Sequence, residues 1–164
     1  MEFEMRKIMP EQEGALIDLF VESFREDHYY RSLFPWNTAG KIRTHFSPVL
    51  LYLVEHGSAL GAFVGEELAG FLLCFDYHRL KSEDGGMLRR IFGVTQPLGS
   101  IPYEEQIHKR VEALDERVIY LLSVAVAEKW RRQGIARAMM GRMLEAFEGY
   151  SFASAVSSSY FLEL

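Results

Sequence analysis

The sequence lacks several features on which common classes of protein depend. Its 164 residues include one cysteine, Cys74, so neither an internal disulfide nor a cysteine metal cluster can form, and a reducing compartment is expected. Its 18 basic residues are outnumbered by 23 acidic ones, and the resulting negative charge has the wrong sign for a domain that binds a nucleic-acid backbone. Its five histidines form no His-x-x-x-His pair, so we predict no metal site.

Long apolar runs are also missing. Uncharged stretches such as residues 118–127 fall well short of the roughly 18 apolar residues that a membrane-spanning helix requires. The first residues include Glu2 and Glu4, where a signal peptide would have basic and then apolar residues. We therefore expect no membrane partner and a cytoplasmic location.

The composition that remains is typical of a folded domain. Hydrophobic residues make up 49% of the chain and aromatic residues 13%, which is far more than a disordered chain carries. The length falls within the range of roughly 100 to 200 residues expected of one domain. We therefore expect residues 1–164 to form a single domain.

Hydrophobic periodicity predicts alternating strands and helices. A helix after Pro10 would bury one apolar face, formed by Leu16, Leu19, Phe20 and Phe24. A kink or break is expected at Pro48. Residues 81–100 read as a loop that covers an acceptor site, or else as a plain surface loop with a short helix. The other predicted elements are strands over 3–8, 59–64, 68–77, 118–126 and 150–156, and helices over 38–55, 103–116 and from Ile135 onward.

The most informative stretch begins at residue 118. Residues 118–126 are nearly uncharged, as a strand buried on both faces should be. They are followed by Arg131-Arg132-Gln133-Gly134 and a helix. A helix start with small residues exposes unpaired N–H groups and the positive end of the helix dipole, so this turn suits a di- or polyphosphate; a solvated connection is the alternative. With Gly134 as its one glycine, the turn is neither a Walker loop nor a Gly-x-Gly-x-x-Gly motif.

Two neighbouring segments carry a recognisable motif. Val124-Ala125-Val126 is followed by Arg131-Arg132-Gln133-Gly134-Ile135-Ala136. This pattern resembles the acetyl-CoA signature of the GCN5-related N-acetyltransferases, in which Arg/Gln-x-x-Gly-x-Gly/Ala follows a Val-x-Val strand. The resemblance extends over most of the chain, because a first strand, two helices and a hairpin precede the signature in the family's order.

The resemblance implies a fold, a co-substrate and a reaction. The fold is α/β, with a mixed, mostly antiparallel sheet flanked by helices, and a bulge splays the fourth strand from the fifth. The pantetheine arm of acetyl-CoA would pair with residues 124–126, and its pyrophosphate would lie on the N–H groups of residues 131–136. The family's reaction transfers the acetyl group directly to a primary amine, and a backbone N–H near Val124 would stabilise the oxyanion.

The motif does not supply the general base. Many family members place a glutamate on the signature strand, whereas here the interior positions hold Tyr120 and Ser123. Tyr120 is the candidate catalytic residue, and a core tyrosine is the alternative reading. Asp76 and His78 are further candidates, and both also suit a surface position.

The C-terminal residues depart from the family pattern. In the family, the helix after the fifth strand begins near an asparagine and carries the tyrosine that protonates the CoA thiolate, and two more strands follow. Here Ser158 takes the place of the asparagine as a cofactor-binding residue, and the tyrosine would fall beyond Leu164. We therefore expect a fold that lacks the last helix and strands.

This departure leaves two alternatives open. A homodimer would cover the unpaired side of the fifth strand. Alternatively, the chain is a non-catalytic or weakly active acyl-CoA-binding module.

The expected acceptor is a small-molecule amine or a peptide N-terminus, because the chain is acidic. Aromatic and acidic residues over 27–36 would either line its pocket or pack in the core.

Overall fold

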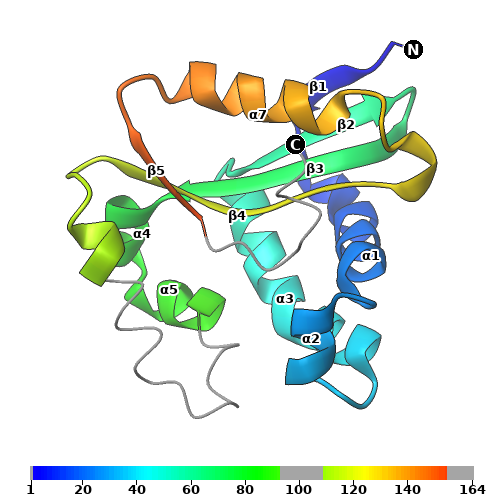
Figure 1. Ribbon diagram of the computed structural model, residues 1–164, viewed down its shortest axis with the longest axis horizontal. Helices are drawn as coiled ribbons and strands as arrows, with labels where there is room; N and C mark the ends of the chain where they lie inside the picture. The colour runs from blue at the N-terminus through cyan, green and yellow to red at the C-terminus, as the bar shows by residue number, and fades with distance from the viewer. Residues whose placement is uncertain (1, 93–108, 155–164) are drawn as a thin grey trace.

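The computed structural model describes residues 2–92 and 109–154. Five strands form one sheet in the order β1-β2-β3-β4-β5 (Figure 1). The first four strands pair antiparallel and β5 pairs parallel to β4. The strands are β1 (Glu4–Lys7), β2 (Ala59–Val64), β3 (Glu67–Asp76), β4 (Val118–Val126) and β5 (Ser151–Ser154). The predicted mixed sheet is therefore confirmed.

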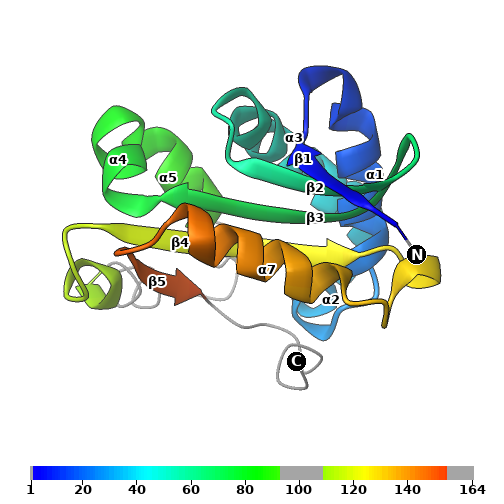
Figure 2. The same cartoon turned by 90° about the horizontal axis from the view of Figure 1, so that it is seen from above.

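Helices cover both faces of this sheet. The helices α1, α3, α4 and α5 lie on one face and α7 lies on the other (Figures 1 and 2). The helices are α1 (Glu13–Phe24), α2 (His28–Leu33), α3 (Thr38–Glu55), α4 (Tyr77–Glu83), α5 (Gly85–Phe92) and α7 (Ile135–Ala146), with 3-10 turns η1 (Pro10–Gln12) and η3 (Glu128–Trp130). Within the described ranges, no helix combines the length and apolar content needed to cross a membrane.

Two hydrophobic clusters hold these layers together. On the α1–α3 face, Phe20 packs against Phe46 and against Phe71 of β3. On the α7 face, Met139 packs with Leu72 and Ile119. Successive residues of a strand point to opposite faces, so β3 supplies side chains to both clusters. Each fully buried side chain of this size contributes roughly 1.5–3 kcal/mol.

Pro48 does not end a helix. The helix α3 runs from Thr38 to Glu55 with Pro48 inside it. Of the kink or break expected at Pro48, the break is therefore wrong. Proline removes the N–H that would bond to the carbonyl of Thr44, but Phe46, Val49 and Leu50 on either side of it are buried. We attribute the continuity of α3 to this packing, which outweighs one lost hydrogen bond.

The segment of residues 81–100 contains the end of α4, up to Glu83, and all of α5, from Gly85 to Phe92. Asp84 caps α5, because its Oδ1 accepts from the N–H of Met87 at 2.9 Å. Leu88, Ile91 and Phe92 on this helix are buried. The alternative of a surface loop with a short helix is the nearer of the two predictions, because α5 begins at Gly85 and is anchored by these three apolar side chains. Residues 93–100 lie outside the described ranges, and so do residues 103–108 of the helix predicted over 103–116. Of its described part, residues 109–112 are helical.

Candidate functional site

A bulge interrupts the pairing of β4 with β3. Leu73 lies opposite Ser123, and the next residue of β3, Cys74, lies opposite Leu121. Leu122 is therefore one extra residue on β4, which bends the strand and increases its local twist. The bulge expected from the family resemblance is thus present, on the side of β4 that faces β3.

Among the described residues, β5 pairs with the first four residues of β4, from Val118 opposite Ser151 to Leu121 opposite Ser154. The first four residues of β4 are accordingly buried, whereas the last five are only half-buried. The prediction of a strand buried on both faces is correct for the first part of β4 and wrong for the rest, with which no described residue of β5 pairs.

Beyond Leu121, the backbone groups of β4 that point away from β3 have no strand partner among the described residues. The N–H of Ala127 donates to the carbonyl of Ala69 at 2.9 Å. Because hydrogen-bonding residues alternate along an antiparallel pair, Ala125 also bonds toward β3, and the N–H and C=O of Val124 and Val126 point the other way. Among the described residues, no strand pairs with Val124 on that side.

The loop after β4 turns sharply into α7. Two of its residues have left-handed backbone conformations, Arg132 with φ of 60° and Gly134 with φ of 82°. Gly134 is the N-cap of α7 and forms no side-chain cap hydrogen bond. A Cβ atom built on Gly134 would meet no heavy atom within 4 Å. The first N–H groups of α7 therefore border open space, where an anion can approach.

Positive charge surrounds this helix start. Arg131, Arg132 and Arg137 are exposed, and the first turn of α7 contains no acidic residue. Lys129 is committed elsewhere, because its Nζ lies 2.7 Å from Glu67 Oε1, and its hydrogen bond lowers the pKa of the Glu67 carboxyl. The helix dipole adds about half a positive charge. Together these groups favour a multiply charged anion.

Gly70 allows α7 to lie close to the sheet, a role that sequence reasoning missed. A Cβ atom on Gly70 would come within 3.0 Å of the Ala125 carbonyl oxygen, 3.2 Å of Met139 Cε and 3.3 Å of Ile135 Cγ2. Ile135 is 1% exposed and Met139 is fully buried. The start of α7, and with it the anion-binding turn, is therefore fixed by contact with β3.

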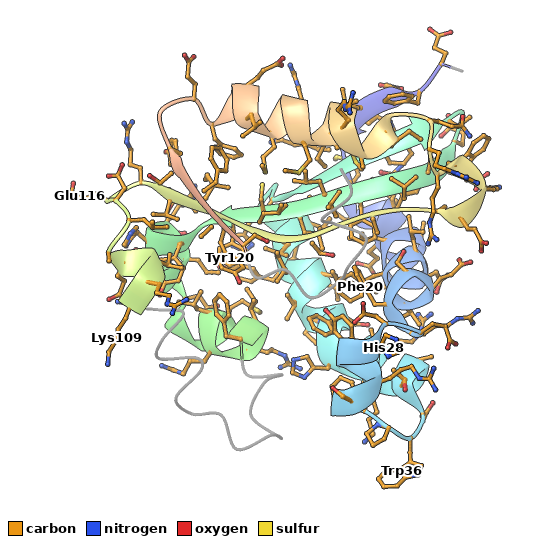
Figure 3. All side chains as sticks on the ribbon, in the orientation of Figure 1. Phe20, His28, Trp36, Lys109, Glu116 and Tyr120 are labelled. Atoms are coloured by element: carbon orange, nitrogen blue, oxygen red, sulfur yellow. The ribbon has the colours of Figure 1, made fainter. Side chains whose placement is uncertain are left out.

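Tyr120, the predicted catalytic residue, lies in the core. It is 4% exposed, and its ring centroid lies 5.5 Å from that of Phe75 and 5.0 Å from that of Phe92. Figure 3 shows its side chain beneath the sheet, on the α5 side. The nearby Ser123 hydroxyl is buried and has no hydrogen-bond partner among the described residues.

The two outlying base candidates have structural contacts at the other end of β3. Asp76 caps α4, because its Oδ1 accepts from the N–H of Arg79 at 3.0 Å. His78 Nε2 lies 2.9 Å from the Asp115 carbonyl oxygen. Asp76 pairs with Ile119, near the beginning of β4, so both candidates are distant from the open edge at Val124.

The remaining predicted site residues are divided between two regions. Tyr30 packs in the core, with its ring centroid 5.4 Å from Phe24, whereas Trp36 is 83% exposed and lies at the far tip of the helical layer (Figure 3). The structure therefore does not bring these two aromatic residues into one pocket. Ser158 lies outside the described residues.

Comparison with known proteins identifies the class to which this fold and site belong. The sequence model of the acetyltransferase (GNAT) family matches residues 13–159. The chain therefore belongs to the GNAT acetyltransferases, and the family resemblance seen in the sequence is confirmed. No curated protein matches the sequence.

Solved structures of low sequence identity share the fold. The C-terminal condensation domain of Ebony, in complex with beta-alanyl-dopamine, has a TM-score of 0.74 at 15% identity, covering 99% of this chain and 79% of that one. An agmatine N-acetyltransferase has a TM-score of 0.68 at 12% identity, covering 99% and 80%. The PaiA N-acetyltransferase of Thermoplasma acidophilum, in complex with coenzyme A, has a TM-score of 0.56 at 14% identity, covering 90% and 73%.

Proposed function

We propose that this protein transfers the acetyl group of acetyl-CoA to the primary amine of a small molecule or peptide. One observation carries the proposal. The open backbone edge of β4 at Val124 leads, through the turn at Arg131–Gly134, to the uncapped start of α7. An extended thioester arm and a pyrophosphate need these two surfaces in that order.

The turn suits the pyrophosphate. Residues 131–136 would offer the backbone N–H groups at the start of α7, and Arg131 and Arg132 would add fixed positive charge. The open space at Gly134 supports this fit, because a side chain there would stand between the phosphates and the N–H groups. Membership of the acetyltransferase family and the coenzyme A bound to the Thermoplasma protein support acetyl-CoA as the source of this anion.

The edge of β4 suits the pantetheine arm. The amide groups of the arm would pair with the backbone of residues 124–126 as an added strand would. The Val126 carbonyl already accepts a hydrogen bond from Arg131 Nε at 3.1 Å. The arm would therefore rely on the N–H and C=O of Val124 and on the N–H of Val126.

The reaction needs one bond exchange and two proton movements. The amine nitrogen attacks the thioester carbon, a C–N bond forms and the C–S bond breaks. The Val124 N–H, on the open side, would stabilise the oxyanion. The amine loses a proton to a base, for which Tyr120 is the candidate, and the CoA thiolate gains one.

The proposed acceptor is a cationic amine. The net charge of −5 attracts cations. Of the similar structures, one is bound to beta-alanyl-dopamine and another is named for its action on agmatine.

Two further proposals concern the location and the oligomeric state of the protein. We place it in the cytoplasm, and we propose a homodimer over β5, where Phe152 is 36% exposed.

A non-catalytic acyl-CoA-binding module is the second candidate. The observation that favours it is the placement of the predicted bases: Tyr120 is packed between aromatic rings, and Asp76 caps α4. Binding of acetyl-CoA is common to both candidates, so turnover separates them.

Thiol release tests the catalytic proposal. The protein is mixed with acetyl-CoA and a panel of amines that includes agmatine, dopamine, spermidine and a basic peptide, and acetylated products are identified by mass spectrometry. We expect amine-dependent thiol release that the Gly134→Asp variant lacks. Binding of acetyl-CoA without turnover on any amine would favour the binding module.

A further inference from the structure

A cavity of about 480 Å³ lies away from the proposed acetyl-CoA site. Its walls include the end of α3, the last residues of β3, the start of α4, and Arg142, Met143 and Ala146 of α7. The proposed acetyl-CoA site is at the start of α7, and a helix of this length spans roughly 18 Å. Figure 2 shows that the start of α7 lies toward the loop that follows β4, whereas its C-terminal end lies on the side of the molecule where α4 covers the other face of the sheet.

The inner wall of this cavity is apolar and partly aromatic. Leu72 and Met143, which line it, are 1% and 4% exposed. The wall also includes Tyr52 and His56, whose rings stack with centroids 3.9 Å apart and planes 17° apart. The volume lies within the range of small-molecule pockets, roughly 300–1,000 Å³. A flat apolar body would therefore fit against this wall.

The acidic groups of the lining are already engaged. Glu83 Oε1 accepts from Arg79 Nε at 2.9 Å, so these two charges balance one another. Asp76 caps α4 through the N–H of Arg79. The four basic residues of the lining, Arg6, Lys7, Arg79 and Arg142, outnumber these two carboxylates.

Two basic residues of the lining are poorly balanced. In the described part of the chain, Lys7 forms no ion pair, and its Nζ lies beside Gly57, 3.2 Å from where a Cβ atom would stand. Arg142 contacts Glu145 at 3.9 Å, with both side chains more than 60% exposed, and such a pair contributes little. The cavity therefore has excess positive charge in a protein whose net charge is −5.

We propose that this cavity is a second ligand-binding site, separate from the acetyl-CoA site, and that it takes a small aromatic carboxylate. The aromatic body would lie against Leu72, Met143 and the stacked Tyr52 and His56 rings. The carboxylate would be held by Lys7 and Arg142. Since α7 contributes to both sites, a ligand here contacts the helix whose other end borders the proposed phosphate site.

Titration with naphthoate tests the proposal, and naphthylmethanol serves as a neutral ligand of nearly the same shape. We expect saturable binding of one naphthoate per chain, at least about tenfold tighter than the alcohol, because hydrogen bonds to charged groups are stronger than those between neutral groups. Replacing both basic residues, Lys7→Gln with Arg142→Gln, should remove this preference and leave the alcohol unaffected.

Two tryptophan variants on α7 locate the site. Ala146 lines the cavity and is exposed, so Ala146→Trp should fill the cavity and abolish naphthoate binding without disturbing the core. Leu144, on the same helix but not in the lining, is 50% exposed, and Leu144→Trp should bind as the original protein does. Far-ultraviolet circular dichroism verifies that both variants are folded.

The Gly134→Asp variant and excess coenzyme A separate this inference from the proposed function. Naphthoate should bind equally well to Gly134→Asp and in saturating coenzyme A. Competition by coenzyme A would overturn the second site, because the carboxylate would then be occupying the phosphate turn. Absence of saturable binding, equal affinity for the alcohol, or undiminished binding by Ala146→Trp would overturn it too.

Discussion

Arg131 donates from Nε to the backbone carbonyl oxygen of Val126, 3.1 Å away. This bond ties the loop before α7 to the last residue of β4. It also fixes the guanidinium plane at the point where the proposed thioester arm and pyrophosphate meet. A side chain with only a positive charge would not reproduce this contact, because lysine has no planar fork of donors.

Arg131→Lys should therefore weaken acetyl-CoA binding about tenfold although the charge is kept, as expected for the loss of a hydrogen bond made by a charged group. Isothermal titration calorimetry measures the change. Arg110→Lys is the matched control, because Arg110 is exposed on the helical residues 109–112. Equal affinities for all three proteins would show that the Arg131 contact is not used.

Gly70→Ala should destabilise the fold by about 1–3 kcal/mol, the usual cost of overpacking a close contact. The new methyl group would press on the Ala125 carbonyl, 3.0 Å away, and neither strand can move without breaking the sheet. Urea denaturation gives the free energy of unfolding. Gly14→Ala in α1 is the control, because it meets no atom within 4 Å, and we expect it to stabilise by about 0.5–1 kcal/mol.

Tyr120→Phe tests the candidate base. A catalytic hydroxyl requires kcat to fall about 100-fold, with the affinity for acetyl-CoA unchanged. The ring contacts with Phe75 and Phe92 do not need the hydroxyl, so the variant should remain folded. If kcat and its pH dependence are unaltered, Tyr120 is a core residue and the base lies elsewhere.

His45 should make stability fall as the pH is lowered. Its pKa is lowered from 6.5, chiefly because burial disfavours the charged ring, while its contact with the Arg90 carbonyl opposes the shift. A depressed histidine pKa means that the unfolded chain takes up the proton first, so this stability is present above about pH 6.5 and is lost below it. Thermal unfolding at pH 7.5 and 5.5 should show a smaller drop in Tm for His45→Gln. Equal drops for the two proteins would contradict this role.

The parts of the fold that the sequence predicted well are those with strong local patterns. The hairpin of β2 and β3 follows from two apolar runs around Gly65, and its pairing from Val64 opposite Glu67 needs no distant contact. The strand β4 is a continuous apolar run and the helix α7 has apolar residues at helical spacing, with a family motif between them. Local sequence was sufficient in these places because few alternative structures satisfy the same pattern.

The sequence failed where distant residues decide the outcome. Pro48 is a helix breaker by local rules, yet burial of both its neighbouring turns keeps α3 whole. The role of Gly70 depends on Ile135 and Met139, which are far away in the chain. The contacts of Tyr120 involve Phe92, in a segment for which the sequence left a covering loop and a loop with a short helix as alternatives. Such tertiary contacts cannot be deduced from spacing along a single sequence.

Calorimetric titration of acetyl-CoA and of free CoA into the protein and its Gly134→Asp variant tests the central claim most directly. The carboxylate of the variant would stand at the start of α7. There it would repel phosphate and neutralise the positive potential of the helix N-terminus. Gly134→Asn gives the same left-handed position a neutral side chain of the same size, and Gly149→Asp places the same charge on another glycine of positive φ, 81°. We predict that the original protein and Gly149→Asp bind both ligands with micromolar affinity. The affinity of Gly134→Asp should be at least about tenfold lower. The affinity of Gly134→Asn should fall by less. Failure of the original protein to bind either ligand, or equal binding by Gly134→Asp, would contradict an acetyl-CoA site at this turn.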